Sequence, residues 1–262
     1  MRIKAGSIHL NYELTGKSGA PVVMLSHSLG SNLAMWNLQR TALEGRYQVL
    51  TYDMRGHGNS DISEGAYTLE QLADDALYLL DALKIDRVHF VGLSIGGMIA
   101  QAMALKHPDR LLTLTLCSTS AYLPPPALPI LRERIETARN QGLSALVEGT
   151  LERWFTAPYA QEQVQTLEPI RSQFLATSVA GYIGCSEAIG RLNFIERLPA
   201  IALPTLILVG QDDPGTPVAA SEAIHERIKG SKLVILPSAS HLSNIQQASL
   251  FNQHLLEFLQ GH

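Results

Sequence analysis

The chain has 262 residues, of which 46% are hydrophobic and 17% are charged, and its formal net charge is −4. This composition is typical of a folded globular protein and excludes an intrinsically disordered chain. No basic excess indicates a nucleic-acid or anionic-membrane partner, and no apolar run is long enough to predict a transmembrane helix. The two cysteines, Cys117 and Cys185, are too few for a disulfide framework. Together with a first segment that has no signal-peptide pattern, they predict a cytoplasmic protein.

Short apolar segments alternate with longer helical patterns along the chain. The continuous apolar runs are typical of parallel strands that are buried on both faces. This alternation predicts an α/β fold, with a mostly parallel central sheet flanked by helices. Ser7–Leu14 alternates apolar and polar residues and is predicted as a half-exposed strand. The strands predicted from apolar runs are Pro21–Ser26, Gln48–Tyr52, Val88–Leu93, Leu111–Cys117, Thr205–Val209 and Lys232–Leu236. The predicted helices between and after them are Thr68–Leu83 with Thr68 as its N-cap, Gly97–His107, Pro217–Ile228 and Asn244–Leu259.

One segment interrupts the alternation, between residues 120 and 199. Prolines at positions 124 to 126 and at 129 are expected to stop regular structure at its start. Helical patterns follow at Ile130–Ala138 and Leu143–Phe155, without a convincing strand. We therefore predict a sheet-based core from residues 1–119 and 200–262, and a helical cap, or lid, from residues 120–199.

The strongest chemical signal is the sequence Gly92-Leu93-Ser94-Ile95-Gly96-Gly97, which follows a predicted strand and precedes a predicted helix. This is the context of a nucleophile elbow, in which a sharp turn exposes a serine hydroxyl and the small neighbours avoid clashes. The helix N-terminus behind it offers unpaired N–H groups to a developing oxyanion. Ser94 is therefore the candidate nucleophile, with a turn of small residues and no chemistry as the alternative.

A serine nucleophile needs a base, and His241 follows the last predicted strand in the loop PSASHLSN. A carboxylate should orient that imidazole, and the strand before it runs into Asp212 and Asp213. The order Ser94, Asp213, His241 along the chain is the one expected for an α/β-hydrolase triad. Asp213 is favoured over Asp212 because it directly precedes the proline of the next turn.

An oxyanion hole needs two N–H donors. We expect one from Ile95, next to the nucleophile, and the other from Leu29 in the glycine-containing loop after the second predicted strand. The loop after Gln48–Tyr52 contains Asp53 and Arg55, which are expected to form a structural ion pair.

Metal and cofactor motifs are absent from the sequence. There is no CxxC pair, no HExxH and no cluster of ligands at metal-binding spacing, and the loop Gly56-His57-Gly58 matches neither a dinucleotide nor a phosphate-loop pattern. We therefore expect neither a metal nor a cofactor. Cys117 ends a predicted buried strand and is interpreted as a core residue.

Several blocks of the sequence resemble the α/β-hydrolases and, more narrowly, the 3-oxoadipate enol-lactonases of bacterial aromatic catabolism. The resemblance implies a triad of Ser94, Asp213 and His241. It also implies an oxyanion hole at Leu29 and Ile95, and a substrate pocket that includes Ser28 and the lid residue Trp154. The blocks are SLGSNLAMW (28–36), YDMRGHGNSD (52–61), YTLEQLADD (67–75), GLSIGGMIAQ (92–101), LERWFT (151–156) and SHLSN (240–244).

The resemblance implies a serine hydrolase that opens a small lactone, 3-oxoadipate enol-lactone, to 3-oxoadipate through an acyl-enzyme. Three alternative functions stay open: a broader carboxylesterase, a hydrolase of another lactone and a non-catalytic ligand-binding homologue. The oligomeric state, including a homo-oligomer, also stays open. The chain departs from the family pattern at His27, where Asn is common, and at Ile95, where Met is frequent. The substrate's carboxylate requires a cation, and the lid offers several arginines without marking one: Arg132, Arg134, Arg139, Arg153, Arg171 and Arg191.

Overall fold

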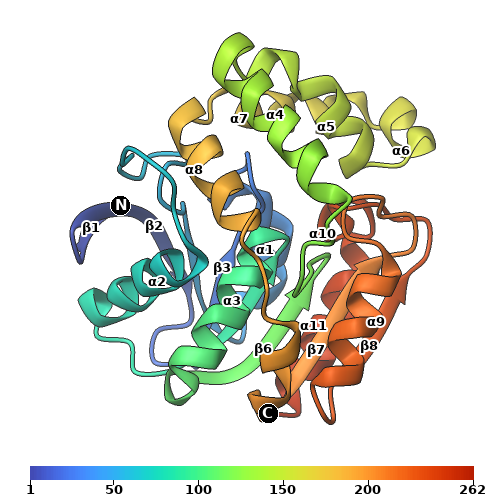
Figure 1. The fold of residues 1–262 in the computed structure, drawn as a ribbon. Coiled ribbons are helices and arrows are strands. Elements are labelled where there is room, and N and C mark those ends of the chain that lie inside the picture. The colour runs from blue at the N-terminus through green and yellow to red at the C-terminus, as the bar shows by residue number, and fades with distance from the viewer.

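The computed structural model describes residues 1–262, which form an eight-stranded sheet in the order β1-β2-β4-β3-β5-β6-β7-β8 (Figure 1). The pairs β1–β2 and β2–β4 are antiparallel, and the other neighbouring strands run parallel. The predicted α/β class with a mostly parallel sheet is therefore confirmed. The strands are β1 (Arg2–Ala5), β2 (Ile8–Gly16), β3 (Val22–Ser26), β4 (Gln48–Tyr52), β5 (Val88–Leu93), β6 (Leu111–Cys117), β7 (Thr205–Gly210) and β8 (Lys232–Leu236). Only β1 was not predicted, because four residues at a sheet edge carry too little apolar pattern.

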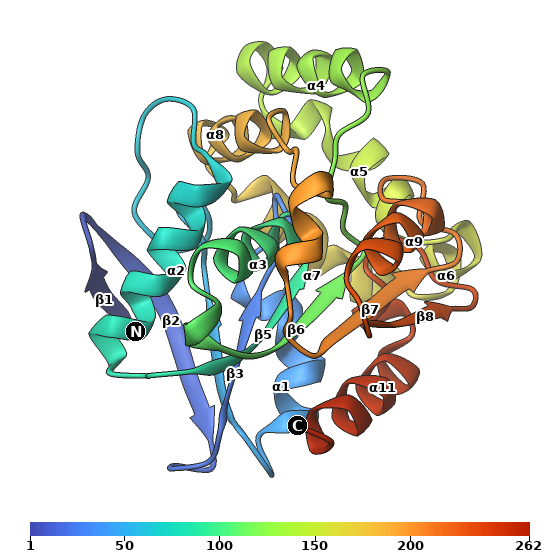
Figure 2. The ribbon, with the colours of Figure 1, turned by 60° about the horizontal axis from the view of Figure 1, so that its bottom comes forward.

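Helices cover both faces of the sheet (Figure 2). Because side chains alternate between the faces of a strand, Met24 of β3 packs into the core beneath α2, α3 and α9, whereas Val23 and Leu25 pack on the side of α1 and α11. Thr68 accepts a hydrogen bond at 3.1 Å from the N–H of Gln71, as expected of an N-cap. The flanking helices are α1 (Asn37–Leu43), α2 (Leu69–Leu83), α3 (Ile95–Lys106), α9 (Val218–Arg227), α10 (Ser243–Gln246) and α11 (Ala248–Gln260).

The prediction of one continuous C-terminal helix was wrong. Gln247 has φ −120° and ψ 45°, which separates α10 from α11. The short α10 is held in its own direction by Asn244, whose buried amide donates to the carbonyl of Met35 at 3.2 Å and to Oε1 of Gln39 at 3.1 Å. These contacts come from a distant part of the chain, so the helical periodicity of the segment could not reveal the break.

Five helices lie between β6 and β7 and form a group above the sheet in Figure 1. Pro129 does not stop regular structure, because it lies in the first turn of α4, where a missing N–H breaks no helical hydrogen bond. No helix of the chain is both long and apolar enough to cross a membrane. The five helices are α4 (Ala127–Gln141), α5 (Val147–Trp154), α6 (Ala157–Glu162), α7 (Val164–Leu175) and α8 (Val179–Ile189).

Candidate active site

Ser94 sits in the turn between β5 and α3 with φ 59° and ψ −120°, a strained conformation for a residue with a side chain. The turn is possible because the backbone passes very close to two glycines. A Cβ on Gly92 would lie 2.2 Å from the carbonyl oxygen of Gly96, and a Cβ on Gly96 would lie 2.2 Å from that of Ser26. The glycines therefore permit the local geometry that exposes the Ser94 hydroxyl to the cavity.

Asp213 and His241 meet beyond the ends of β7 and β8. His241 Nδ1 lies 2.8 Å from Oδ2 of Asp213, whose side chain is fully buried. The other carboxylate oxygen accepts hydrogen bonds from the N–H groups of Gly215 at 2.8 Å and of Thr216 at 3.0 Å. Asp212, the alternative acid, makes no such contact with the imidazole. Asp213 is thus the carboxylate that the fold brings to His241.

Thr216 is a member of this cluster that the sequence analysis did not single out. Its hydroxyl donates to Oδ2 of Asp213 at 2.7 Å and lies 3.3 Å from Nδ1 of His241. Burial raises the pKa of Asp213, but the charge of His241 and the hydrogen bonds from His241 and Thr216 outweigh burial and hold the pKa below its ordinary value. The carboxylate is therefore ionised at neutral pH and accepts the proton-bearing Nδ1.

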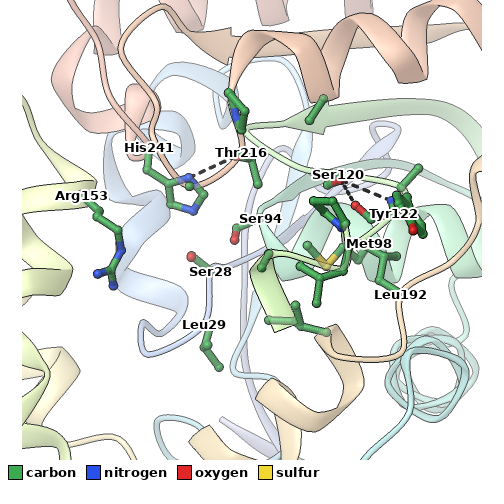
Figure 3. Close-up of a pocket in the computed structure, with 18 of the residues that line it drawn as sticks. Ser28, Leu29, Ser94, Met98, Ser120, Tyr122, Arg153, Leu192, Thr216 and His241 are labelled. Carbon is green, nitrogen blue, oxygen red and sulfur yellow. Dashed lines mark hydrogen bonds between the residues drawn. The ribbon is translucent and has the colours of Figure 1, made fainter. Parts of the chain in front are cut away.

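This contact determines which nitrogen of His241 faces the cavity as a base. Because Nδ1–H donates to Asp213, the lone pair of the neutral ring is on Nε2. His241 and Ser94 both line the same cavity, and Figure 3 shows the imidazole beside the serine side chain. The arrangement can move a proton from the serine hydroxyl to the imidazole.

The two N–H groups expected to form the oxyanion hole have no hydrogen-bond acceptor within the chain. Neither the N–H of Leu29 nor that of Ile95 donates a hydrogen bond to a backbone carbonyl or a side chain. Ile95 is the first residue of α3, where helical N–H groups have no partner within the helix and carry partial positive charge. Leu29 and Ser28 line the cavity on the side of the β3 loop. The two free donors are available to an oxyanion.

His27 orients the peptide that carries the Leu29 N–H. Its Nε2 accepts a hydrogen bond from the N–H of Met54 at 3.0 Å, so its proton is on Nδ1, which donates to the carbonyl of Ser28 at 2.8 Å. That carbonyl belongs to the same peptide plane as the Leu29 N–H, and in a trans peptide the two groups point in opposite directions. The histidine at position 27 therefore links this loop by hydrogen bonds to the loop after β4.

His57 holds the next peptide in the same way. Its Nε2 accepts from the N–H of Gly30 at 3.0 Å, and Nδ1 donates to the carbonyl of Arg55 at 3.2 Å. Complete burial lowers the pKa of His27 to about 4, against a smaller opposing effect of its bond to Ser28. Burial, followed by repulsion from His27, lowers the pKa of His57 to about 3. Both rings are neutral at physiological pH, which their acceptor bonds require.

The expected ion pair between Asp53 and Arg55 was wrong. Arg55 pairs with Asp75 of α2 through two hydrogen bonds, at 2.7 and 2.5 Å, and both side chains are buried. Asp53 instead accepts hydrogen bonds from the N–H groups of Leu33 at 2.8 Å and Asn59 at 2.9 Å. Two backbone N–H groups and the amide of Asn11, which donates at 2.8 Å, satisfy Asp53, so Arg55 is free to join two segments that the sequence separates.

The cavity has a volume of about 500 Å³ and lies between the strand ends and the inserted helices. Trp154 and Phe174 contribute to its apolar wall, and two inserted arginines, Arg134 and Arg153, also line it. No aspartate or glutamate lines this cavity. No group of three or more His, Cys, Asp or Glu side chains is placed to hold a metal ion.

Comparison with known proteins places this geometry in a family. Residues 21–248 match the model of the alpha/beta hydrolase fold. The chain is 34% identical to 3-oxoadipate enol-lactonase 2 of Acinetobacter baylyi over 97% of this chain and 94% of that protein.

Solved structures of enzymes with the same fold are also similar to this chain. The enol-lactonase from Burkholderia xenovorans LB400 has a TM-score of 0.96 and 38% identity, over 99% of this chain and 100% of that one. A thermophilic esterase from Thermogutta terrifontis, solved with malate bound, has a TM-score of 0.92 and 31% identity, over 100% of this chain and 98% of that one. The chain therefore belongs to the α/β-hydrolase family and is related to the enol-lactonases.

Proposed function

We propose that the chain is a serine hydrolase that opens a small lactone, with 3-oxoadipate enol-lactone as the substrate and 3-oxoadipate as the product. The observation that carries the proposal is the 2.8 Å contact between His241 Nδ1 and Asp213, with Ser94 on its strained turn lining the same cavity. The enol-lactonase relatives support the lactone rather than another ester. The step belongs to aromatic catabolism in this proposal.

In the first half of the reaction, Nε2 of His241 removes the proton of the Ser94 hydroxyl as its oxygen attacks the lactone carbonyl. Asp213 stabilises the imidazolium that forms. The N–H groups of Leu29 and Ile95 receive the oxyanion, and each such donor contributes about 2.7–4 kcal/mol in comparable hydrolases. The ring C–O bond then breaks and the oxygen leaves as an enol, which takes the proton from His241.

In the second half, water hydrolyses the ester between Ser94 and the opened chain. His241 takes a proton from the water, the hydroxide adds to the acyl carbon, and Ser94 leaves with the proton returned to it. The enol remains attached throughout, because it was part of the ring, and it ketonises to the 3-oxo acid. One water is consumed for each lactone opened, and the residues end as they began.

We also propose that residues 120–199 act as a cap over a core of residues 1–119 and 200–262. Support comes from the lining of the cavity, to which α5 contributes Arg153 and Trp154 and the elbow contributes Ser94. A cap of this kind limits the access of water and bulky esters. A cytoplasmic location belongs to the same proposal and is supported by the two cysteines, which are buried and unpaired.

The proposal is tested by a panel of lactones and esters with the purified protein and its Ser94→Ala variant. Enol-lactone hydrolysis should be fast in the wild type and should fall by roughly 10⁴- to 10⁶-fold in the variant. A fluorophosphonate probe should label the wild type and not Ser94→Ala. Near-normal turnover by the variant would refute the mechanism. Absent labelling of the wild type would favour a ligand-binding protein without catalysis.

A broader carboxylesterase is the second candidate, because the related Thermogutta terrifontis protein is an esterase. The two candidates differ in their preferred substrate. A lactonase should have a much higher kcat/KM for the enol-lactone than for neutral 4-nitrophenyl esters of similar size. The reverse order would identify an esterase that uses the same serine.

A further inference from the structure

The carbonyl of Ser94 is bonded by a side chain from another part of the fold. Oγ1 of Thr119, in the loop after β6, donates a hydrogen bond to this oxygen at 2.7 Å, and both residues are buried. The other donors to the oxygen are the N–H groups of Gly97 and Met98 in the first turn of α3, at 2.9 and 3.1 Å. Thr119 thus joins the nucleophile elbow to the strand beside it.

This carbonyl belongs to the peptide that carries the Ile95 N–H, one of the two expected oxyanion donors. In a trans peptide the C=O and N–H groups point in opposite directions, so a bond that fixes the oxygen also fixes the direction of the N–H. A hydrogen bond to the oxygen also polarises the peptide and strengthens its N–H as a donor. The two helical bonds hold the peptide relative to α3, and the bond from Thr119 holds it relative to the sheet.

The peptide of the Leu29 N–H is held in a matching way. Its carbonyl, that of Ser28, accepts the hydrogen bond from Nδ1 of His27 at 2.8 Å. Each of the two peptides therefore combines an N–H that has no partner in the chain with a carbonyl that is bonded by a buried side chain. Donors that are fixed before the substrate arrives are what an oxyanion hole requires.

The surroundings of Thr119 keep its side chain in place. A Cβ on Gly97 would lie 2.8 Å from the Cβ of Thr119, so the absence of a side chain at position 97 leaves the space that the threonine occupies. The next residue of the loop is also bonded to α3, because Nε2 of Gln101 donates to the carbonyl of Ser120 at 3.0 Å. Two successive residues of this loop are therefore bonded to the elbow and its helix, which limits the movement of the threonine.

We propose that Thr119 is a positioning residue of the oxyanion hole, which directs the Ile95 N–H as His27 directs the Leu29 N–H. The inference rests on the proposed hydrolase function and goes beyond it, because Thr119 does not line the cavity and acts through the peptide it bonds. The oxyanion exists only after the serine has attacked. Loss of the Thr119 hydroxyl should therefore lower kcat and leave KM nearly unchanged.

The first test replaces the hydroxyl and keeps the shape of the side chain. Thr119→Val should lower kcat on the enol-lactone and on a 4-nitrophenyl ester by roughly 10- to 30-fold, a part of the roughly 10²- to 10³-fold cost of deleting an oxyanion donor. Thr119→Ala, which places no methyl group beside the Ser94 carbonyl, is the second variant and should show a similar loss. Thr119→Ser keeps the hydroxyl and should stay within about threefold of the wild type.

A matched control is available on the same strand. Thr115 of β6 is also fully buried, but its hydroxyl has no hydrogen-bond partner in the chain. Thr115→Val should therefore keep the wild-type kcat. A loss in Thr115→Val equal to that in Thr119→Val would overturn the inference. So would a Thr119→Ser variant as slow as Thr119→Val, because packing rather than the hydroxyl would then be responsible.

The rate of labelling by a fluorophosphonate separates this inference from the proposed function. Negative charge also develops on the phosphonyl oxygen when the serine attacks it, so labelling of Thr119→Val should slow by a factor similar to that for kcat, in protein shown by circular dichroism to be folded. Equally fast labelling of the wild type and Thr119→Val would overturn the role of Thr119 and leave the hydrolase intact. Absent labelling of the wild type would refute the hydrolase and this inference with it.

Discussion

His27 and His57 are neutral and buried in the folded chain, so lowering the pH from 8 to 5 should destabilise it. In the unfolded chain each ring has an ordinary pKa of about 6.5 and becomes protonated over this range. In the folded chain the pKa is about 4 for His27 and about 3 for His57, so both rings stay neutral at pH 5. The unfolded state therefore binds more protons. The contribution of the two neutral rings to the free energy of unfolding is complete above pH 6.5. It is lost as the pH falls from 6.5 toward the pKa values of the folded state.

The size of the effect follows from the gap between the unfolded pKa and the working pH. At pH 5 that gap is about 1.5 units, and one unit corresponds to about 1.4 kcal/mol. Each ring should therefore lower the free energy of unfolding at pH 5 by about 2 kcal/mol. Mutual repulsion does not enter at pH 5, because neither folded ring is charged. The two together should remove about 4 kcal/mol, which is a large share of the 5–15 kcal/mol typical of a folded domain.

The assay is urea unfolding followed by circular dichroism at pH 8 and pH 5, for the wild type and His27→Asn. Asparagine does not titrate in this range, so the loss between the two pH values should shrink by about 2 kcal/mol. The value at pH 8 separately measures the cost of replacing the bonds to Ser28 and Met54. His262→Asn, at the exposed C-terminus, is the control for the substitution itself. An equal pH-dependent loss in the wild type and His27→Asn would refute the reasoning.

Two further substitutions test the elements that position the nucleophile and the base. Asp213→Asn should lower kcat by roughly 10⁴-fold at pH 8. An amide N–H facing Nδ1 favours the other tautomer of His241, in which Nε2 carries the proton and cannot act as the base. A kcat within tenfold of the wild type would contradict the role of Asp213. Gly96→Ala places a Cβ 2.2 Å from the backbone oxygen of Ser26, which cannot move without shifting β3, and should lower the free energy of unfolding by about 3 kcal/mol or more. Thermal unfolding checks this, and an unchanged Tm would show that the turn relaxes freely.

The sequence alone determined those features whose causes are local. Continuous apolar runs predict six of the eight strands, and alternating apolar and polar residues predict a seventh, the antiparallel β2. Glycines two positions before and after Ser94 mark the elbow. The clash that Gly92 avoids is with Gly96 in the same turn, whereas Gly96 avoids a clash with Ser26 of the neighbouring strand. The positions of Asp213 and His241 after successive strands could be read in the same way, since carboxyl ends of parallel strands meet at one edge.

Only the tertiary structure decided which distant groups meet. Arg55 pairs with Asp75 rather than Asp53, and nothing in the spacing of the three residues distinguishes the partners. Likewise, Arg134 and Arg153 line the cavity, whereas Arg139 of the same insertion pairs with Glu136 at the surface. These outcomes depend on how helices from separate segments pack over the strand ends. Ion-pair and hydrogen-bond partners depend on distances in the folded structure, and a pattern along the chain does not give those distances.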